Sequence, residues 1–315
     1  NQRDGLHRQA IARGRVAYEP NSLAGGCPYQ AGPRGFASFP QPLEADKVRG
    51  KPEKFAEHYN QATLFWNSQS DIEKQHIIRA FRFELSKVQV NAVRRRVVAQ
   101  LRNVAPELAE ALATGLGMTE LPDPLPRAMR KTPKPEVSSS EALSLFARPG
   151  VEGIKTRRVA IIVAPGTNLS QANTLHRLLL EEGAVPRFVG VQLGPVGDSA
   201  EDAIEVEISL ETAPAAVWDG MIVPGGEAGL GVLAQSGQAL EFLKDQYRHC
   251  KPILLLDEAD QLLNAAGFPE EVVEAAEDTG LLSLSGSDVA SATRSFVSAL
   301  AQHRHFSRET DPPRI

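Results

Sequence analysis

Cysteine is nearly absent from this sequence of 315 residues, and its two copies, Cys27 and Cys250, lie far apart. Neither has a second cysteine or a histidine at the spacing of a metal-ligand pair. This excludes a cysteine zinc motif and disfavours a disulfide framework. The cysteine usage instead favours a reducing compartment, which we expect to be the cytoplasm.

Long apolar runs and an excess of positive charge are also missing. No hydrophobic run approaches the roughly 18 residues of a membrane-spanning helix, and no charged-then-apolar leader opens the chain. The net charge of -5 at pH 7 and the 42% of hydrophobic residues are typical of a soluble protein, so we expect no nucleic-acid and no membrane partner. The length allows about two domains. Because the first residue is Asn1 and not Met, we expect the chain to begin inside a larger protein.

The first fifty residues lack a regular period. Residues 1–52 are rich in glycine, proline and arginine and follow neither the strand period nor the helix period, which predicts an irregular extended segment without a core of its own. Its aromatic residues and prolines suit a segment laid across a partner surface, whereas a mobile tail is the alternative.

Apolar residues at helical spacing predict a small all-α domain over residues 53–120. The motif Ser70-Asp-Ile-Glu73 resembles a capping signal, and Gly115 and Gly117 are good helix terminators. The arginine run at 94–96 fits a solvated helix face better than a nucleic-acid site, given the acidic total. The expected helices are 53–60, 72–90, 93–104 and 108–116.

After a proline-rich connector at 121–155, apolar runs alternate with helical segments. This order predicts an α/β fold, a flavodoxin-like doubly wound domain with a parallel sheet over 156–305, followed by a tail at 306–315. Gly183 is the expected end of the first helix. The expected strands are 158–163, 186–192, 220–223 and 252–256, and the expected helices are 170–182, 229–248, 258–266 and 287–304.

Three loops at strand ends, 164–170, 224–229 and 257–260, form the rim where an open parallel sheet binds ligands by default. The Gly225-Gly226 pair is a weak phosphate signal, and packing at a tight turn is the favoured reading. Asp257, Glu258 and Asp260 either raise one another's pKa and prepare a general acid or base, or charge a helix N-terminus favourably. We favour the second reading, because no nucleophile neighbours them in sequence.

Two further features are better explained by structural roles than by functional ones. His303 and His305 form an HxH pair that we place in the last helix, and a pair without a third ligand is poor evidence for a metal. Cys250 precedes Lys251 at the end of a helix, which favours half-buried packing over a reactive thiol. The residues alone therefore predict an architecture but no catalytic constellation.

Several stretches resemble one known family, the haem-dependent catalases. Segments at 1–8, 18–22, 47–49 and 55–59 resemble those that follow the haem-binding core of these enzymes. Segments at 64–69, 75–78 and 81–88 look like their helical domain. A helical domain followed by a proline-rich linker and a flavodoxin-like domain is similar to the large-subunit catalases, and the resemblance covers essentially the whole chain.

The resemblance implies dismutation of hydrogen peroxide to water and oxygen at a haem, with protection from oxidative stress, in a homotetramer whose extended segments wrap neighbouring subunits. The family's distal histidine and asparagine and its haem-ligand tyrosine lie upstream of Asn1. His7, Tyr18 and Tyr29 occupy other motifs and do not take those roles. We therefore expect no catalytic, cofactor-binding or metal residue in this chain, and a role in assembly and stability.

The α/β region also resembles the DJ-1/PfpI superfamily, through Ile222-Val-Pro-Gly-Gly226 and Lys251-Pro-Ile253. Active members carry a cysteine at the strand-to-helix elbow, where this sequence has Asp257 or Glu258. Their carboxylate after the first strand falls near Gln171. These departures imply a vestigial elbow, and the alternative function is an autonomous DJ-1-like binding or chaperone module.

Overall fold

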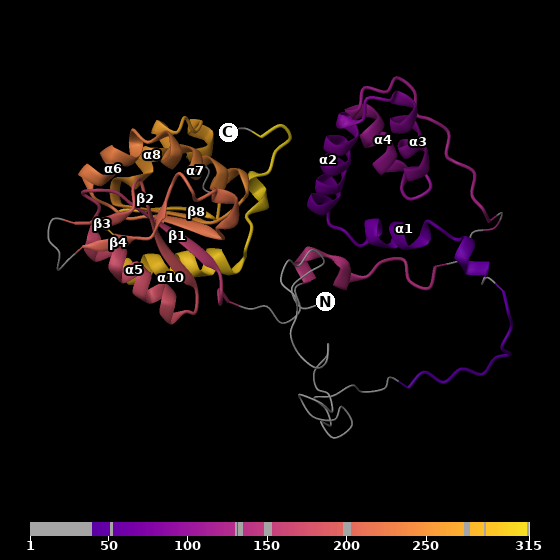
Figure 1. Ribbon diagram of the computed structural model, residues 1–315, viewed down its shortest axis with the longest axis horizontal. Coiled ribbons are helices and arrows are strands. Elements are labelled where there is room, and N and C mark those ends of the chain that lie inside the picture. Colours follow the sequence, from indigo (N-terminus) through magenta and orange to yellow (C-terminus); the bar gives the residue numbers. More distant parts are fainter. Residues whose placement is uncertain are drawn as a thin grey trace, which may run out of the picture. The chain divides into compact units, whose positions relative to one another are not determined.

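The computed structural model describes residues 40–50, 53–129, 131, 135–147, 153–197, 203–273, 278–286, 288–313 and 315 (Figure 1). Residues 1–57 and 58–315 form two compact units. Most of the predicted wrapping segment, 1–52, lies outside the described residues. Its described part, 40–50, contains neither helix nor strand.

Residues 53–120, which we predicted to form a small all-α domain, contain four helices and one 3-10 helix. Trp66, Val98 and Leu112 are almost fully buried in the core of this segment. The predicted helix at 53–60 is wrong, because that segment forms only a short 3-10 helix, and the next helix places Trp66 in the core instead. The elements are η2 (Glu53–Ala56), α1 (Asn60–Asn67), α2 (Asp71–Lys87), α3 (Asn91–Leu101) and α4 (Pro106–Gly115).

Local signals set two of these helix ends. The Ser70 hydroxyl accepts from the Glu73 backbone N–H at 3.4 Å, and the Glu73 carboxylate accepts from the Ser70 N–H at 2.9 Å. This reciprocal pair satisfies two of the free donors at the start of α2 and confirms the capping signal. Gly117 has a φ of +68°, which glycine adopts without strain, and α4 ends at Gly115 as expected.

The proline-rich connector is attached to the helical domain along part of its length. Two 3-10 helices, η3 (Glu141–Leu143) and η4 (Leu145–Ala147), lie within it. The Gln69 amide donates to the Leu143 carbonyl at 3.1 Å, and the Ser68 hydroxyl accepts from the Ser140 N–H at 2.8 Å. The connector is therefore helical over part of its length and contacts α1 and the residues that follow it.

The second domain is α/β, with a six-stranded sheet in the order β5-β2-β1-β6-β7-β8. Every pair in this sheet is parallel, and β3 and β4 form a separate antiparallel pair. The elements are β1 (Arg158–Val163), α5 (Leu169–Glu181), β2 (Val185–Gly190), β3 (Gly194–Val196), β4 (Ile204–Val206), β5 (Ile208–Ser209), η5 (Ala215–Val217), β6 (Gly220–Val223), α6 (Glu227–Ala234), α7 (Gly237–Arg248), β7 (Ile253–Leu256), η6 (Asp257–Asp260), α8 (Gln261–Ala265), α9 (Glu270–Val273), β8 (Leu281–Leu284), α10 (Val289–Ala301) and η7 (Phe306–Arg308).

Helices cover both faces of this sheet, as Figure 1 shows: α5 and α10 lie on one side, and α6, α7 and α8 on the other. The central strands β6 and β7 are buried along their whole length, which explains why their sequences are continuously apolar rather than alternating. Gly183, with a φ of +80°, follows α5 as predicted.

Three boundaries in this domain were predicted wrongly. The expected helix at 229–248 is broken at Gln235 and Ser236, because the Ser236 hydroxyl caps a new helix, α7. The segment at 258–266 begins as a 3-10 helix, and α10 ends at Ala301 rather than at 304. Strand β8, a partly exposed edge strand beside β7, was not predicted.

Candidate functional site

The carboxyl edge of the sheet is the place where a doubly wound domain binds ligands, at the point where the strand order reverses. Here that point lies between β1 and β6. The Asn168 N–H, in the loop after β1, donates to the Gly225 carbonyl, in the loop after β6, at 2.8 Å. The two loops therefore contact each other directly, backbone to backbone.

Glycines make this close contact possible. A Cβ added to Gly226 would lie 2.5 Å from the Gly166 carbonyl oxygen, and one added to Gly229 would lie 2.6 Å from the Thr167 nitrogen. Gly226 also has a φ of +122°, which side chains rarely tolerate. The space beside these glycines is occupied by the neighbouring loop. This supports the packing reading of Gly225-Gly226 over the phosphate reading.

Asp257 is the strained residue of this rim. It follows β7 with a φ of +52°, an uncommon conformation for a residue with a side chain. Its carboxylate accepts from the Gln171 amide nitrogen at 2.7 Å and from the Gly286 N–H at 3.2 Å. The Gln171 amide oxygen in turn accepts from the Gly225 N–H at 2.9 Å. A hydrogen-bonded relay therefore joins the loops after β6, β7 and β8 to the start of α5.

The structure separates the other two acidic residues of this loop from the relay. Glu258 and Asp260 lie in η6 with exposed side chains, and Asp260 accepts from the Ser283 hydroxyl at 3.4 Å. Both are in the first turn of a helical segment that leads into α8, where negative charge is favourable. Of the predicted elbow residues, only Asp257 and Gln171 are brought together.

The two histidines of the HxH pair contact different protein groups. The pair follows α10 instead of lying within it, which corrects our placement. The Arg157 guanidinium donates to Nδ1 of His303 at 2.6 Å. His305 is buried and its Nε2 donates to the Ala299 carbonyl, so its Nδ1 accepts from the Thr279 hydroxyl. Burial, reinforced by the Arg308 charge, lowers the pKa of His305. Among the described residues, no group of three acidic, histidine or cysteine side chains is arranged to hold a metal.

Cys250 and Lys251 are both buried where α7 leads into β7. Burial raises the pKa of the Cys250 thiol to about 11, which makes it a poor nucleophile and confirms the packing reading, although the residue is fully rather than half buried. From the sequence, Lys251 was named only as part of a motif, and no role was predicted for its side chain. The Lys251 Nζ donates to the carbonyls of Ala215 and Ala216 at 3.2 and 2.7 Å, and burial lowers its pKa to about 8.

Arg308 and Asp278 form a buried ion pair that the sequence also did not reveal. The Nε–Oδ2 distance is 2.6 Å, and the two side chains are 1% and 7% exposed. A second guanidinium nitrogen of Arg308 donates to the Lys251 carbonyl at 2.6 Å. Partners 30 and 57 positions apart in sequence satisfy this buried charge, as a charge away from water requires.

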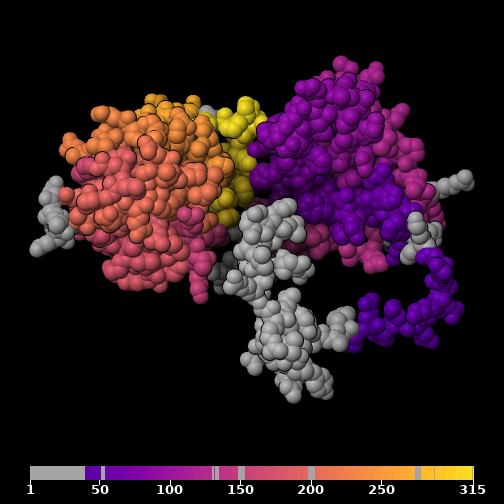
Figure 2. Space-filling view, in the orientation of Figure 1, coloured from indigo at the N-terminus to yellow at the C-terminus, as the bar shows by residue number. Residues whose placement is uncertain are grey.

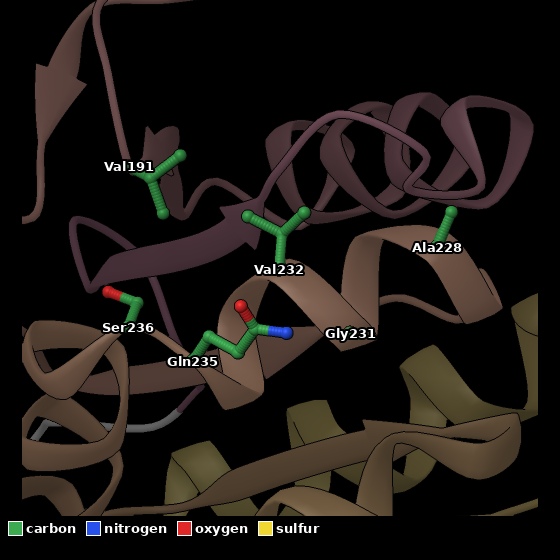
Figure 3. Close-up of a pocket in the computed structure, with 6 residues that line it drawn as sticks. All are labelled: Val191, Ala228, Gly231, Val232, Gln235 and Ser236. Atoms are coloured by element: carbon green, nitrogen blue, oxygen red, sulfur yellow. The ribbon is translucent and has the colours of Figure 1, made fainter.

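An open groove of about 540 Å³ lies on the outer face of α6. Figure 3 shows Ala228, Gly231, Val232 and Gln235 along this helix, with Val191 across from Val232 and Ser236 at the end. Val232 is exposed, and the lining is largely small or apolar. The lining includes neither Asp257 nor Gln171, so the groove is separate from the relay at the strand ends.

None of the helices among the described residues is long and apolar enough to span a membrane. Residues 52–116 match the family model "Catalase-related immune-responsive", and residues 155–310 match "C-terminal domain found in long catalases".

Relatives along 98% of the chain include catalase HPII of Pseudomonas putida at 38% identity, catalase HPII of Pseudomonas aeruginosa at 35% and catalase-2 of Bacillus subtilis at 33%. The chain spans 42%, 42% and 43% of these proteins, respectively. Residues 52–116 and 155–310 are thus similar to two successive domains of long catalases.

Proposed function

We propose that this chain is the post-haem part of a catalase that dismutates hydrogen peroxide to water and oxygen, and that it serves assembly and stability. The observation that carries the proposal is similarity to catalases over 98% of the chain, which spans only 42% of the length of the Pseudomonas putida relative. We place the peroxide chemistry in the part of the protein that this chain does not include.

The groove on α6 and the buried His305 do not fit a haem. Haem iron takes an axial histidine, cysteine, methionine or tyrosine that faces the cofactor's cavity. The groove on α6 has none of these among its lining residues. Both ring nitrogens of the buried His305 have partners within the protein. We therefore propose that no residue of this chain takes part in the peroxide chemistry.

The closed rim supports a structural role for the α/β domain. Asp257, Gln171 and Gly225 satisfy one another's hydrogen bonds, and the loops at the switch point pack backbone against backbone. The order of strands β2-β1-β6-β7-β8, with helices on both faces of the sheet, supports our proposal of a flavodoxin-like domain. In our proposal the strained Asp257 stands at a vestigial elbow of the DJ-1/PfpI type. The hydrogen-bonded relay through Asp257 and Gln171 then holds the loops of the rim together.

Haem binding tests this function directly. We expect the isolated chain to show no Soret absorption and no oxygen release from peroxide. A fusion with the portion of the Pseudomonas putida relative that this chain does not match should show both. A stoichiometric Soret band in the isolated chain would overturn the proposal, as would a fusion that loads haem equally well and is equally stable without residues 53–315.

Assembly is the second part of the proposal. In the complete protein we expect a homotetramer in which residues 1–52 lie across a neighbouring subunit. Protease should then cleave this segment readily in the isolated chain and slowly in the fusion. Equal cleavage rates in the two proteins would remove the wrapping role.

The groove on α6 favours one other function, the binding of unfolded apolar segments by an autonomous module. Val232 is 39% exposed, and Leu193, two residues after the lining residue Val191, is 63% exposed. Exposed apolar surface is a recognised feature of interaction sites. Residues 155–315, which have their own hydrophobic core, should then suppress aggregation of an unfolded client at equimolar amounts. Val232→Asp should abolish this effect. Lack of suppression at excess would exclude this function.

A further inference from the structure

Charged side chains at intervals of three residues wind along α2. They are Glu73, His76, Arg79 and Arg82, and neighbours at this spacing adjoin on a helix surface. None of the four is fully exposed: Glu73 is buried and the other three are intermediate. Other parts of the chain therefore shield this stripe of four side chains partly from water.

The end of the connector covers Glu73. The Ser144 hydroxyl and the Leu145 N–H donate to the two oxygens of its carboxylate, at 2.9 and 2.5 Å. Burial alone would raise the pKa of Glu73, but the hydrogen bonds from Ser70, Leu145 and Ser144 outweigh it and the pKa is lowered. The carboxylate is thus held ionised where the connector approaches α2.

The C-terminal tail covers the basic part of the stripe. Glu309 accepts from Arg79 at 3.0 Å and lies 2.7 Å from Nε2 of His76, and Asp311 accepts from Arg82 at 2.6 Å. The side chains of Glu309 and Arg79 are 18% and 27% exposed. Two acidic residues therefore meet two arginines and a histidine, with complementary charge and partial shielding from water.

The tail is itself fixed to the α/β domain. Arg308, the neighbour of Glu309, forms the buried pair with Asp278, and the His305 N–H donates to the Cys250 carbonyl at 2.7 Å. The ring of Phe306 lies 5.6 Å from the rings of both His76 and Phe146. Successive residues thus serve opposite purposes, because Arg308 anchors the tail inward and Glu309 presents its charge to α2. In Figure 2 the tail, in yellow, forms part of the molecular surface.

We infer that these contacts form an electrostatic clasp that couples the helical domain to the α/β domain. We call the set Glu73, His76, Arg79, Arg82, Glu309 and Asp311 the α2 clasp. The hydrophobic clusters of the two domains share no residue among those described: one draws on residues 66–121, the others on 154–315. The ion pairs on α2, together with the ring contacts of Phe306, therefore carry the coupling. Because the ion pairs are partly exposed, they weaken as salt rises.

Charge reversal in the full chain tests the clasp. Three variants are compared with the wild type. The first carries both Glu309→Lys and Asp311→Arg, the second carries both Arg79→Glu and Arg82→Glu, and the third carries all four substitutions. Each reversed pair should speed proteinase K cleavage of residues 128–153 by roughly fivefold, the size of effect that two or three partly exposed ion pairs give together. The fourfold variant restores opposite charges and should return to within about twofold of the wild-type rate.

A matched control reverses an exposed ion pair elsewhere in the α/β domain, Arg187 and Glu207, which are 3.0 Å apart. This change should leave linker cleavage unaltered. The double variant Glu309→Gln/Asp311→Asn removes both negative charges with little change in side-chain shape. It should also speed linker cleavage, but by less than the charge reversal. For the wild type, raising NaCl from about 0.05 M to about 1 M should also speed cleavage.

Unchanged cleavage in both reversed pairs would overturn the inference, as would a fourfold variant as sensitive as either of them. A fold check by near-ultraviolet circular dichroism separates release of the clasp from unfolding of a domain. If reversal unfolds a domain, the Gln and Asn variants and the salt series decide the result. The readout needs neither haem nor peroxide, so it is independent of the proposed catalytic parent.

Discussion

At the scale of single residues, Asp257 and Gln171 act as a directional pair. A carboxylate only accepts hydrogen bonds, whereas an amide donates at one end and accepts at the other. The Gly225 N–H fixes the oxygen end of Gln171, so its nitrogen must face Asp257, whose second oxygen takes the Gly286 N–H. Each residue type is therefore determined by its neighbour.

This directionality predicts the outcome of a mutant cycle. Asp257→Asn should lower the free energy of unfolding by about 1–3 kcal/mol, because an Asn can accept from only one of the two donors and leaves the other unsatisfied. Gln171→Glu should also destabilise, because it places two carboxylates together. The double variant Asp257→Asn with Gln171→Glu restores a donor opposite an acceptor. Urea unfolding should show it more stable than either single variant, and additive losses would contradict the relay.

Lys251 predicts a pH dependence of stability. Its pKa is lowered from 10.5 to about 8 by burial, so between these values the unfolded chain binds more protons than the folded one. The cost of burying its charge is fully present below pH 8, and the free energy of unfolding rises as pH increases toward 10.5.

Lys251→Met should remove this rise. We expect the stability difference between wild type and Lys251→Met to change by about 3 kcal/mol between pH 7.5 and 10.5, at about 1.4 kcal/mol per pKa unit. Urea unfolding at several pH values measures it. Cys250, whose pKa is raised, titrates nearby but is present in both proteins, so the comparison isolates the lysine. Parallel curves would show that Lys251 is not the cause.

At the scale of elements, most helices and strands followed from local patterns. The strands at 158–163 and 220–223 were predicted with the bounds that the structure has, because buried parallel strands are continuously apolar. The start of α2 followed from Ser70 and Glu73, which lie three residues apart. The break between α6 and α7 was missed, because apolar spacing continues across it and only the Ser236 cap marks it.

The cap at Ser236 should therefore matter to stability. Its hydroxyl accepts from the Ala239 N–H at 3.3 Å. Ser236→Ala should cost about 1 kcal/mol, because a donor at the start of α7 loses its partner. Ser291→Ala, on the exposed face of α10, is a matched control that should stay within about 0.5 kcal/mol of wild type. Equal effects in thermal unfolding would contradict a capping role for Ser236.

At the scale of the whole molecule, separate cores predict separate unfolding. The helical domain and the α/β domain bury different hydrophobic clusters, so cooperative loss of one core does not require loss of the other. We expect two transitions in urea for the full chain, followed by far-ultraviolet circular dichroism. The charge-reversal variant Glu309→Lys/Asp311→Arg should move the urea midpoints of the two transitions further apart. A single transition in every variant would contradict independent unfolding of the two cores.

The sequence by itself determined the α/β class, most helices and strands and the likeness to catalases, because periodicity, caps and family motifs are local along the chain. Only the tertiary structure decided which polar residues meet. Gln171 and Asp257 are 86 positions apart, and Arg82 and Asp311 are 229 apart. Such pairs form because the sheet order and the anchored tail bring distant segments together, and no pattern within one segment carries that information.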